Sequence, residues 1–245
     1  MKKNFTILSV LLITLFSLTV KAQDDKPTAK SYMAFIGGLS SPMGDYASTS
    51  YINNNSGFAK KGTTYGLDFG IYLHKNFGIG ITLSVQDQGE LDSTDVQNLA
   101  NGYNSSFVKN QTSVTSVGRF SNMILMAGPQ YSFLYKNFTL DLRAQAGVIK
   151  SFTTPATTIV FDYSSNSGQT YYQESSGAVA LAYGASVGLR YSLGDTWDVG
   201  LKVNYISSSG LKISNTGGDA GTTGRFQTNM PVSLIQPTLG ITLKF

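Results

Sequence analysis

The 245-residue sequence has no cysteine and few charged residues. Without thiols the chain has no disulfide framework, no cysteine-based metal site and no cysteine nucleophile. Charged residues make up 13% of the chain, about half of the ~25% that is usual in soluble domains. No apolar run after residue 22 approaches the ~18 residues of a transmembrane helix. The 26 glycines, 14 tyrosines and 14 phenylalanines instead indicate a folded, all-β protein.

The first 22 residues have the three-part pattern of a secretory signal peptide. Two lysines follow Met1, residues 5–20 are mostly apolar, and Val20-Lys21-Ala22 places small residues at the −3 and −1 positions of a cleavage site. The apolar segment is shorter than the ~20 residues of a membrane span, so we expect cleavage rather than anchoring. Cleavage leaves 15 basic and 14 acidic residues, which is no basis for nucleic-acid binding. We therefore divide the chain into a signal peptide at 1–22, a short segment at 23–30 and a β domain at 31–245.

Apolar residues alternate with small or polar ones through most of the remaining chain. From Phe77 to Val85 and from Phe138 to Val148 every second residue is apolar, which is the period of a β-strand with two different faces. The alternation predicts eight strands, at 31–40, 62–74, 77–88, 116–135, 138–151, 177–193, 197–211 and 232–245. Three connections are tight, and four are long and polar, at 41–61, 89–115, 152–176 and 212–231. A hairpin within a long connection would raise the number of strands to ten.

The composition of the polar face separates a membrane barrel from a soluble one. A soluble β domain turns a face rich in Lys and Glu to water, whereas here that face is mostly Gly, Ser, Thr and Gln. The apolar face continues for nine or more residues, enough for a tilted membrane-spanning strand. Short turns alternating with long loops are typical of outer-membrane barrels. We therefore predict an all-β, transmembrane, antiparallel up-and-down barrel of eight strands. Aromatic residues beside the short turns fit an interfacial girdle: Phe77, Tyr135, Phe138, Tyr191 and Trp197.

Residues on the polar face fill the lumen if the apolar face meets lipid. Charges in a water-poor interior have to be paired, and an eight-stranded barrel is just wide enough for its side chains to fill. We therefore expect a structural plug of salt bridges and hydrogen bonds, with an ion-selective path or gate as the alternative. The predicted lumen cluster is Asp68, Gln130, Asp141, Arg143, Gln145, Arg190, Asp198 and Lys202.

The end of the chain carries a resemblance to a known family. Leu239, Ile241 and Leu243 alternate up to the terminal Phe245, an ending similar to the C-terminal signal that the barrel-assembly machinery reads in bacterial outer-membrane barrels. The chain from residue 23 onward, with its opening segment at 35–46, resembles the PorT-like group of small outer-membrane β-barrel domains and, more distantly, OmpA/OmpX-type barrels. The resemblance implies an outer-membrane location, with outer-membrane lipids and the assembly machinery as partners.

Three other features resemble catalytic or binding motifs, and each has a simpler structural explanation. His74 is the single histidine, and a hydrolase would need it beside a nucleophile and an orienting acid, whereas its predicted place is a short turn. The glycine-rich run at 217–224 lacks the Lys-Ser/Thr ending of a phosphate loop. One long loop carries acids without the spacing of an EF-hand, namely Asp87, Glu90, Asp92 and Asp95. We therefore expect no enzymatic activity, no metal site and no cofactor.

The long loops are where specific function is expected, since function concentrates in loops on a rigid scaffold. They are rich in Asn, Ser, Thr, Gly and Tyr, and tyrosine makes contacts at low entropic cost. Our first hypothesis is a structural or interaction protein of the outer membrane that contacts a surface ligand or protein through these loops. The second is a narrow pore or small-solute transporter, and the third is a membrane-embedded enzyme.

Overall fold

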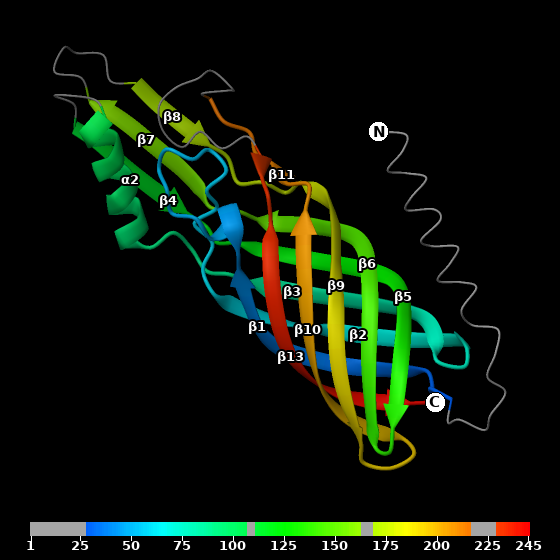
Figure 1. Cartoon of the computed structure of the whole chain (residues 1–245). Coiled ribbons are helices and arrows are strands. Elements are labelled where there is room, and N and C mark those ends of the chain that lie inside the picture. The colour runs from blue at the N-terminus through cyan, green and yellow to red at the C-terminus, as the bar shows by residue number, and fades with distance from the viewer. Residues whose placement is uncertain (1–27, 107–110, 163–168, 217–228) are drawn as a thin grey trace, which may run out of the picture.

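Eight strands close into a single antiparallel barrel, as the alternation predicts. The computed structural model describes residues 28–106, 111–162, 169–216 and 229–245, so the expected signal peptide and the glycine-rich run at 217–224 lie outside the described residues. Each strand pairs with the next barrel strand along the chain, and the first closes on the last (Figure 1). The barrel strands are β1 (Tyr32–Pro42), β2 (Gly62–His74), β3 (Phe77–Asp87), β5 (Ser121–Tyr135), β6 (Phe138–Thr153), β9 (Val179–Ser192), β10 (Trp197–Ser208) and β13 (Ser233–Lys244).

Two of the tight turns depend on a lysine in an unusual backbone conformation. Lys75 joins β2 to β3 with a φ of 45°, and Lys136 joins β5 to β6 with a φ of 53°. Positive φ is uncommon for residues other than glycine. The pairing of the two flanking strands, rather than a preference of lysine, therefore determines the conformation of these turns. The β5–β6 turn places Tyr135 directly opposite Phe138, and Phe138 opposite Tyr191 on β9.

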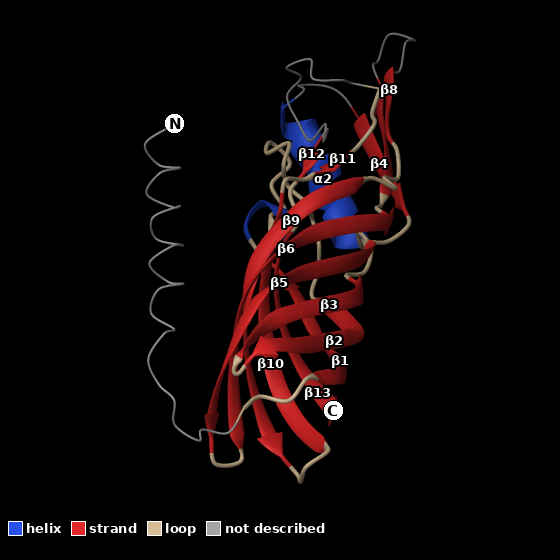
Figure 2. Cartoon of the chain, turned by 90° about the vertical axis from the view of Figure 1, so that its right-hand side faces the viewer, coloured by secondary structure: helices blue, strands red, loops and turns tan. Residues whose placement is uncertain are grey.

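The long connections contain regular structure that the sequence analysis did not predict. They hold the short helix η1 (Gly44–Ala47), helix α2 (Ser93–Ser106) and strands β4 (Gln111–Val117), β7 (Ala156–Asp162), β8 (Gln169–Gln173), β11 (Leu211–Lys212) and β12 (Asn229–Met230). Strands β4, β7 and β8 form a separate three-stranded sheet, and β11 pairs with β12. Figures 1 and 2 show α2 and this sheet extending beyond the barrel at its long-loop end. No described helix is long and apolar enough to span a membrane.

Two predicted strands have different limits in the structure. The first two residues of the strand expected at 116–135 belong to a separate strand, β4, because the chain turns at Gly118, whose φ is +95°. That value lies in the left-handed region that favours glycine, so β4 leaves the barrel direction and β5 begins at Ser121. The strand expected at 197–211 ends at Ser208. Gly210, with a φ of +100°, then redirects the chain into β11.

Asp92 and Asp95 start α2 by capping its first turn. The backbone N–H of Asp95 donates to a carboxylate oxygen of Asp92 at 3.0 Å, and the N–H of Asp92 donates to Asp95 at 3.2 Å. This reciprocal pair is a capping box, which satisfies backbone donors that a helix N-terminus otherwise leaves free. The two acids therefore have a structural role in the loop where the sequence analysis expected only solvated carboxylates.

Candidate functional site: the closed lumen and the loop-side module

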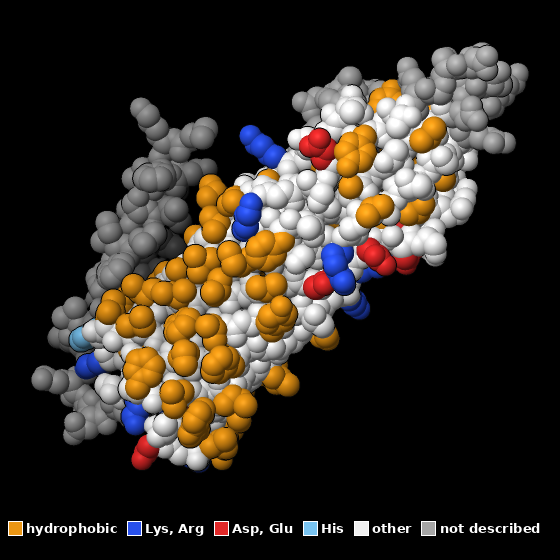
Figure 3. Space-filling model, turned by 180° about the vertical axis from the view of Figure 1, so that it is seen from behind, with side chains coloured by type: hydrophobic (Ala, Val, Ile, Leu, Met, Phe, Trp, Pro, Cys, Tyr) orange, Lys and Arg blue, Asp and Glu red, His pale blue; other side chains and the backbone are white. Residues whose placement is uncertain are grey.

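The outer wall of the barrel carries a continuous apolar belt. On β6 the outward residues run from Phe138 to Val148 without a charged side chain, and Lys150 is the next outward residue. Ten residue steps span roughly 33 Å along a strand, or about 25 Å along the membrane normal for a typical tilt, which is the height of the belt in outer-membrane barrels. Figure 3 shows hydrophobic side chains gathered over the barrel and far fewer over the loop side. This surface suits a lipid bilayer.

The aromatic residues named from the sequence lie at the short-turn end of the belt. The rings of Phe138 and Tyr191 pack with centroids 5.0 Å apart. Tyr135 and Trp197 are exposed on the same side, while Phe77 is half-buried beside the β2–β3 turn. Exposed aromatic side chains at this height are typical of a membrane–water interface.

The centre of the lumen is occupied by a cluster around Arg143. Its guanidinium contacts Asp68 at 2.9 Å and donates to the Gln130 amide oxygen at 2.6 Å. Lys202 reaches the same Asp68 carboxylate at 2.6 Å and donates to Thr82 at 3.0 Å. These residues come from β2, β3, β5, β6 and β10, so one cluster ties five strands together across the interior.

A second ion-pair cluster, centred on Arg190, lies nearer the short turns. Arg190 contacts Asp141 at 2.7 Å and Asp198 at 3.0 Å. Lys244, beside the last residue of the chain, reaches the other oxygen of Asp198 at 2.6 Å. Each buried carboxylate therefore faces at least one cation, as a low-dielectric interior requires.

Tyrosine side chains connect the two charged clusters. The Tyr32 hydroxyl donates to Asp68 at 3.0 Å, and the guanidinium carbon of Arg190 lies 4.0 Å from the centre of the Tyr32 ring, a distance suited to a cation–π contact. Tyr72 accepts a hydrogen bond from Gln130 at 2.8 Å and donates to Asp141 at 3.2 Å. The two charged clusters therefore form one hydrogen-bonded network rather than isolated pairs.

Inward-facing glycines make room for the large side chains of this network. A Cβ atom on Gly80 would lie 1.9 Å from the guanidinium Nε of Arg143, and one on Gly70 would lie 2.2 Å from the ring of Tyr32. The Tyr32 ring rests on the backbone of its register partner Gly70 on the neighbouring strand, and the Arg143 guanidinium rests on Gly80, two strands away. These two glycines are therefore needed for the packing of the plug.

A second polar layer, separate from the ion pairs, lies farther toward the loops. The Gln236 amide donates to Gln86 at 2.8 Å and to Ser40 at 3.2 Å, and Ser40 donates to Gln86 at 3.1 Å. Gln145, also assigned to the lumen from the sequence, is buried, and its amide atoms have no hydrogen-bond partner in the described part of the chain. Gln145 therefore does not join either charged cluster.

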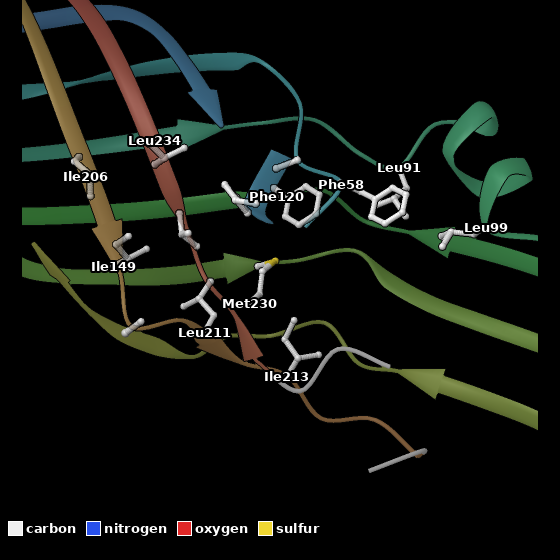
Figure 4. Close-up of a cluster of buried hydrophobic side chains, with 14 of the residues drawn as sticks. Phe58, Leu91, Leu99, Phe120, Ile149, Ile206, Leu211, Ile213, Met230 and Leu234 are labelled. Carbon is white, nitrogen blue, oxygen red and sulfur yellow. The ribbon is translucent and has the colours of Figure 1, made fainter. Parts of the chain in front are cut away.

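The loop-side end of the lumen is closed by apolar side chains. Ile124, Ile149, Ile206 and Leu234 point into the barrel and are at most 2% exposed. They pack against residues of the long connections (Figure 4), which include Phe58, Phe120, Leu211, Ile213 and Met230. The predicted all-polar lumen is wrong at this end, because the loops fold back over the barrel and exclude water from it.

The cavity at the centre of the lumen is too small for a conduit. It measures about 30 Å³ and lies among Tyr32, Arg143, Arg190 and Lys202, which is room for one or two water molecules. Among the described residues, ion pairs, then glutamines and then apolar side chains occupy successive levels of the lumen from the short-turn side to the loop side.

Helix α2 and the sheet β4-β7-β8 form what we call the loop-side module. One face of the sheet packs on the helix side, where Phe161 meets Tyr103 and Tyr171 edge-on at centroid distances of 5.4 and 5.5 Å. The opposite face, the module's free face, presents mostly uncharged residues. Its members are Ser113, Thr115, Val117, Ala156, Thr158, Val160, Thr170 and Tyr172. None of these eight side chains is charged, and none is buried in the described part of the structure.

Ion pairs fasten the base of the loop side. Lys60 pairs with Asp92 and, at 2.8 Å, with Asp95, and Arg119 pairs with Asp87 at 2.9 Å. The hydrogen bond from Lys60 lowers the pKa of Asp92, and the same contact raises the pKa of Lys60. Three of the four acids considered as cation ligands are therefore engaged with cationic side chains.

His74 is the last residue of β2, at the short-turn end of the barrel. Its side chain is exposed and stands next to Lys75 in the turn. None of the hydrogen bonds described above for the ionic clusters of the lumen involves His74.

Several members of the network escaped the sequence analysis. Tyr32 stands in the run Tyr32-Met33-Ala34-Phe35-Ile36, where both faces are apolar and alternation does not separate inward from outward. Inward Ile124 and Ile149 each stand beside an outward apolar neighbour. Such doublets, where alternation fails near the loop end of a strand, are the signal that would have found the apolar closure.

Comparison with known proteins gives a likeness of fold alone. No protein-family model and no curated protein matches the chain. Among solved structures, Neisserial surface protein A is 12% identical, with a TM-score of 0.48, and the match covers 90% of this chain and 100% of that one. Ail of Yersinia pestis is 13% identical over 89% and 100%, with a TM-score of 0.41. The β-barrel domain of Pseudomonas aeruginosa OprF is 14% identical over 89% and 99%, with a TM-score of 0.34. The finer resemblance to the PorT-like group stays a prediction.

Proposed function

We propose that this protein is a bacterial outer-membrane barrel whose plugged lumen is structural and whose loop-side module contacts a ligand or protein at the cell surface. The filled lumen is the observation that carries the proposal. Ion pairs such as Arg143–Asp68 and apolar residues such as Ile124 occupy successive levels of the interior, which leaves the module as the feature able to meet a partner.

The apolar belt and the expected signal peptide support the outer-membrane location. A closed barrel whose outer face is apolar needs lipid around it, and outer-membrane barrels have short turns on the periplasmic side. In that orientation the loop-side module faces outward. Export through a cleaved signal peptide at 1–22 remains part of the proposal.

The last strand suits the proposed recognition by the barrel-assembly machinery. Leu239, Ile241 and Phe245 are exposed on the belt side of β13, and Leu243 is half-buried on the same side. Because β13 pairs with β1 to close the barrel, it is available as an edge until closure. Replacing Phe245 by alanine is expected to slow insertion in cells and to leave the purified, refolded barrel folded.

Single-channel recording tests the plugged lumen. The purified, refolded chain should give no conductance steps in planar bilayers, because the cavity of about 30 Å³ admits no continuous file of water. Stable, unitary openings of the wild type would contradict the proposal and favour the narrow pore.

Photo-crosslinking in intact bacterial cells tests the module. A photoreactive residue at Thr115 on the free face should form discrete adducts with protein or glycan that mass spectrometry identifies. The matched position is Leu125 on the belt, where only lipid adducts are expected. Adducts of the same kind at both positions, or none at Thr115 in cells of the native host, would remove the loop-mediated function.

A further inference from the structure

The outer wall of the barrel contains an apolar groove of about 700 Å³. It crosses β1, β13, β10, β9 and β6, and its floor is the backbone at Gly200 and Gly240. One side follows the register row Gly37–Leu239–Leu201. Five strands at the usual spacing of about 4.8 Å give the groove a length of about 19 Å.

The groove has one end at the membrane interface and the other inside the belt. Phe138, the first residue of β6, pairs with Tyr191 at the short-turn side. From there the opposite row climbs through Val199 and Ile241 to Phe35, the fourth residue of β1. The groove therefore rises obliquely from the aromatic girdle toward the middle of the belt, which is the path of a lipid tail entering from the headgroup region.

We propose that this groove holds one acyl chain of a phospholipid from the leaflet on the short-turn side. Its lining is entirely apolar or aromatic apart from the backbone and the Tyr191 hydroxyl, and the medium around the belt is hydrocarbon. The space exists because Gly37 has no side chain where its neighbours on the row carry leucine. Exposed Lys136, in the turn two residues before Phe138, lies at the interfacial end and gives that end a positive charge suited to a phosphate.

An open groove with protruding edges fits a hydrocarbon chain better than it fits a second copy of the protein. A stable protein interface needs roughly 800 Å² on each partner, whereas the groove is bounded by the protruding side chains of Phe35 and Leu239, which are 65% and 69% exposed. These side chains would hold two flat walls apart but would flank a single hydrocarbon chain.

Filling the groove at Gly37 tests the proposal. A side chain at this position meets open space, since its Cβ would have only one neighbour, at 4.0 Å, so Gly37→Leu blocks the groove without disturbing the wall. The matched control is Ala146→Leu, which adds the same side chain to an exposed belt position on β6 outside the groove.

Native mass spectrometry of the full chain, released from vesicles of phosphatidylglycerol and phosphatidylcholine with identical tails, measures the retained lipid. The wild type and Ala146→Leu should retain one phospholipid. Gly37→Leu should retain about tenfold less, which corresponds to about 1.4 kcal/mol. Lys136→Gln should reduce the preference for phosphatidylglycerol and leave retention of phosphatidylcholine unchanged.

Equal retention by Gly37→Leu and Ala146→Leu, or a dimer that Gly37→Leu abolishes, would overturn the acyl-chain assignment. The inference rests on the proposed membrane location, which a separate measurement isolates. Trp197, the single tryptophan, is exposed on the belt, so tail-brominated lipid should quench its fluorescence in all variants. Absence of quenching in every variant would reject the membrane location, whereas quenching without selective retention would reject the groove alone.

Discussion

Arg143 on β6 donates to both carboxylate oxygens of Asp68 on β2, at 2.9 and 3.2 Å, from three strands away around the barrel. The planar guanidinium matches the two oxygens, and such bidentate pairs are the stronger class of charged hydrogen bond. Because Lys202 on β10 contacts the same carboxylate, Asp68 joins three parts of the wall. This junction makes the lumen a structural element.

Removal of Arg143 is expected to destabilise the barrel without opening it. Arg143→Ala removes the charged donor to the Gln130 amide oxygen and one of the two cations that face the buried Asp68 carboxylate, so the free energy of unfolding should fall by roughly 3–5 kcal/mol. Denaturant unfolding from lipid vesicles, followed by Trp197 fluorescence, measures the loss. Arg119→Ala is the control, because its pair with Asp87 is exposed and should contribute about 0–1 kcal/mol. Equal losses of unfolding free energy for the two variants would show that the interior ion pair stabilises the barrel no more than the exposed pair does.

Gly80 and Gly188 should respond differently to the same substitution. In Gly80→Ala the new Cβ collides with the Arg143 guanidinium, whereas at Gly188 the nearest atom lies at an ordinary 3.7 Å. Overpacking typically costs about 1–3 kcal/mol, so Gly80→Ala should lower the unfolding midpoint and Gly188→Ala should leave it close to that of the wild type. A thermal or denaturant midpoint of Gly80→Ala matching that of Gly188→Ala would contradict the tight fit.

The apolar closure at the loop end is expected to behave as a packed core. Ile124→Ala leaves a cavity inside the barrel, while Leu125→Ala, one residue away on the lipid side, leaves a space that lipid fills. Both variants lose the free energy of transferring the removed side-chain atoms out of water. The unfilled cavity lowers the free energy of unfolding of Ile124→Ala alone by a further amount on the order of 1–3 kcal/mol. Parallel unfolding measurements on the two variants give the difference. A larger loss of unfolding free energy for Leu125→Ala than for Ile124→Ala would show that Ile124 does not lie in a packed core.

The pair between Lys60 and Asp92 should be visible in a pH titration. The lowered pKa of Asp92 means that its contribution to stability is present above the usual carboxyl pKa of ~3.9 and is lost as the pH falls through its folded value. The raised pKa of Lys60 means that its contribution is present below ~10.4 and is lost as the pH rises through its folded value. The pair therefore acts between about pH 4 and pH 10.

Carboxyl chemical shifts from NMR in micelles give the pKa of Asp92 directly. Lys60→Gln should raise that pKa toward its usual value, because the hydrogen bond from Lys60 is the first cause of the lowering. Lys61→Gln, a change in the exposed neighbouring lysine, should leave the pKa of Asp92 where it is. A pKa shift of the same size in both variants would show that the overall positive charge nearby, rather than the hydrogen bond from Lys60, lowers the pKa of Asp92.

Alternation was enough to predict the barrel strands because lipid and lumen make opposite demands on neighbouring residues. From Phe138 to Val148 each outward position is apolar, so the limits of β6, and similarly of β2 and β3, are close to those expected. The prediction was wrong where no lipid constrains the chain. Residues 111–115 were expected in a long connection and residues 116–117 in the same strand as β5, whereas all seven form β4, which the turn at Gly118 divides from β5.

The loop-side module could not be predicted from the sequence, for a related reason. The capping box of Asp92 and Asp95 is a local pattern that could have indicated the start of α2. In the sheet β4-β7-β8, however, β4 pairs with residues of β7 that lie 39 to 51 positions away along the chain. Its strands are short and half-polar, and their pairing depends on contacts such as Phe161 with Tyr103 that no local period records.

Alternation along the chain predicts a barrel of eight strands with an apolar exterior and a charge-bearing interior, because a period of two assigns each residue to one face whatever its neighbours in space. Which charges meet depends on the folded barrel, since Arg143 reaches Asp68 through the stagger of strands around it. The tertiary structure also decided that the loops close the lumen with hydrocarbon and that the missing side chain of Gly37 opens a groove toward the lipid. These features depend on register between strands distant in sequence, which alternation along one strand does not contain.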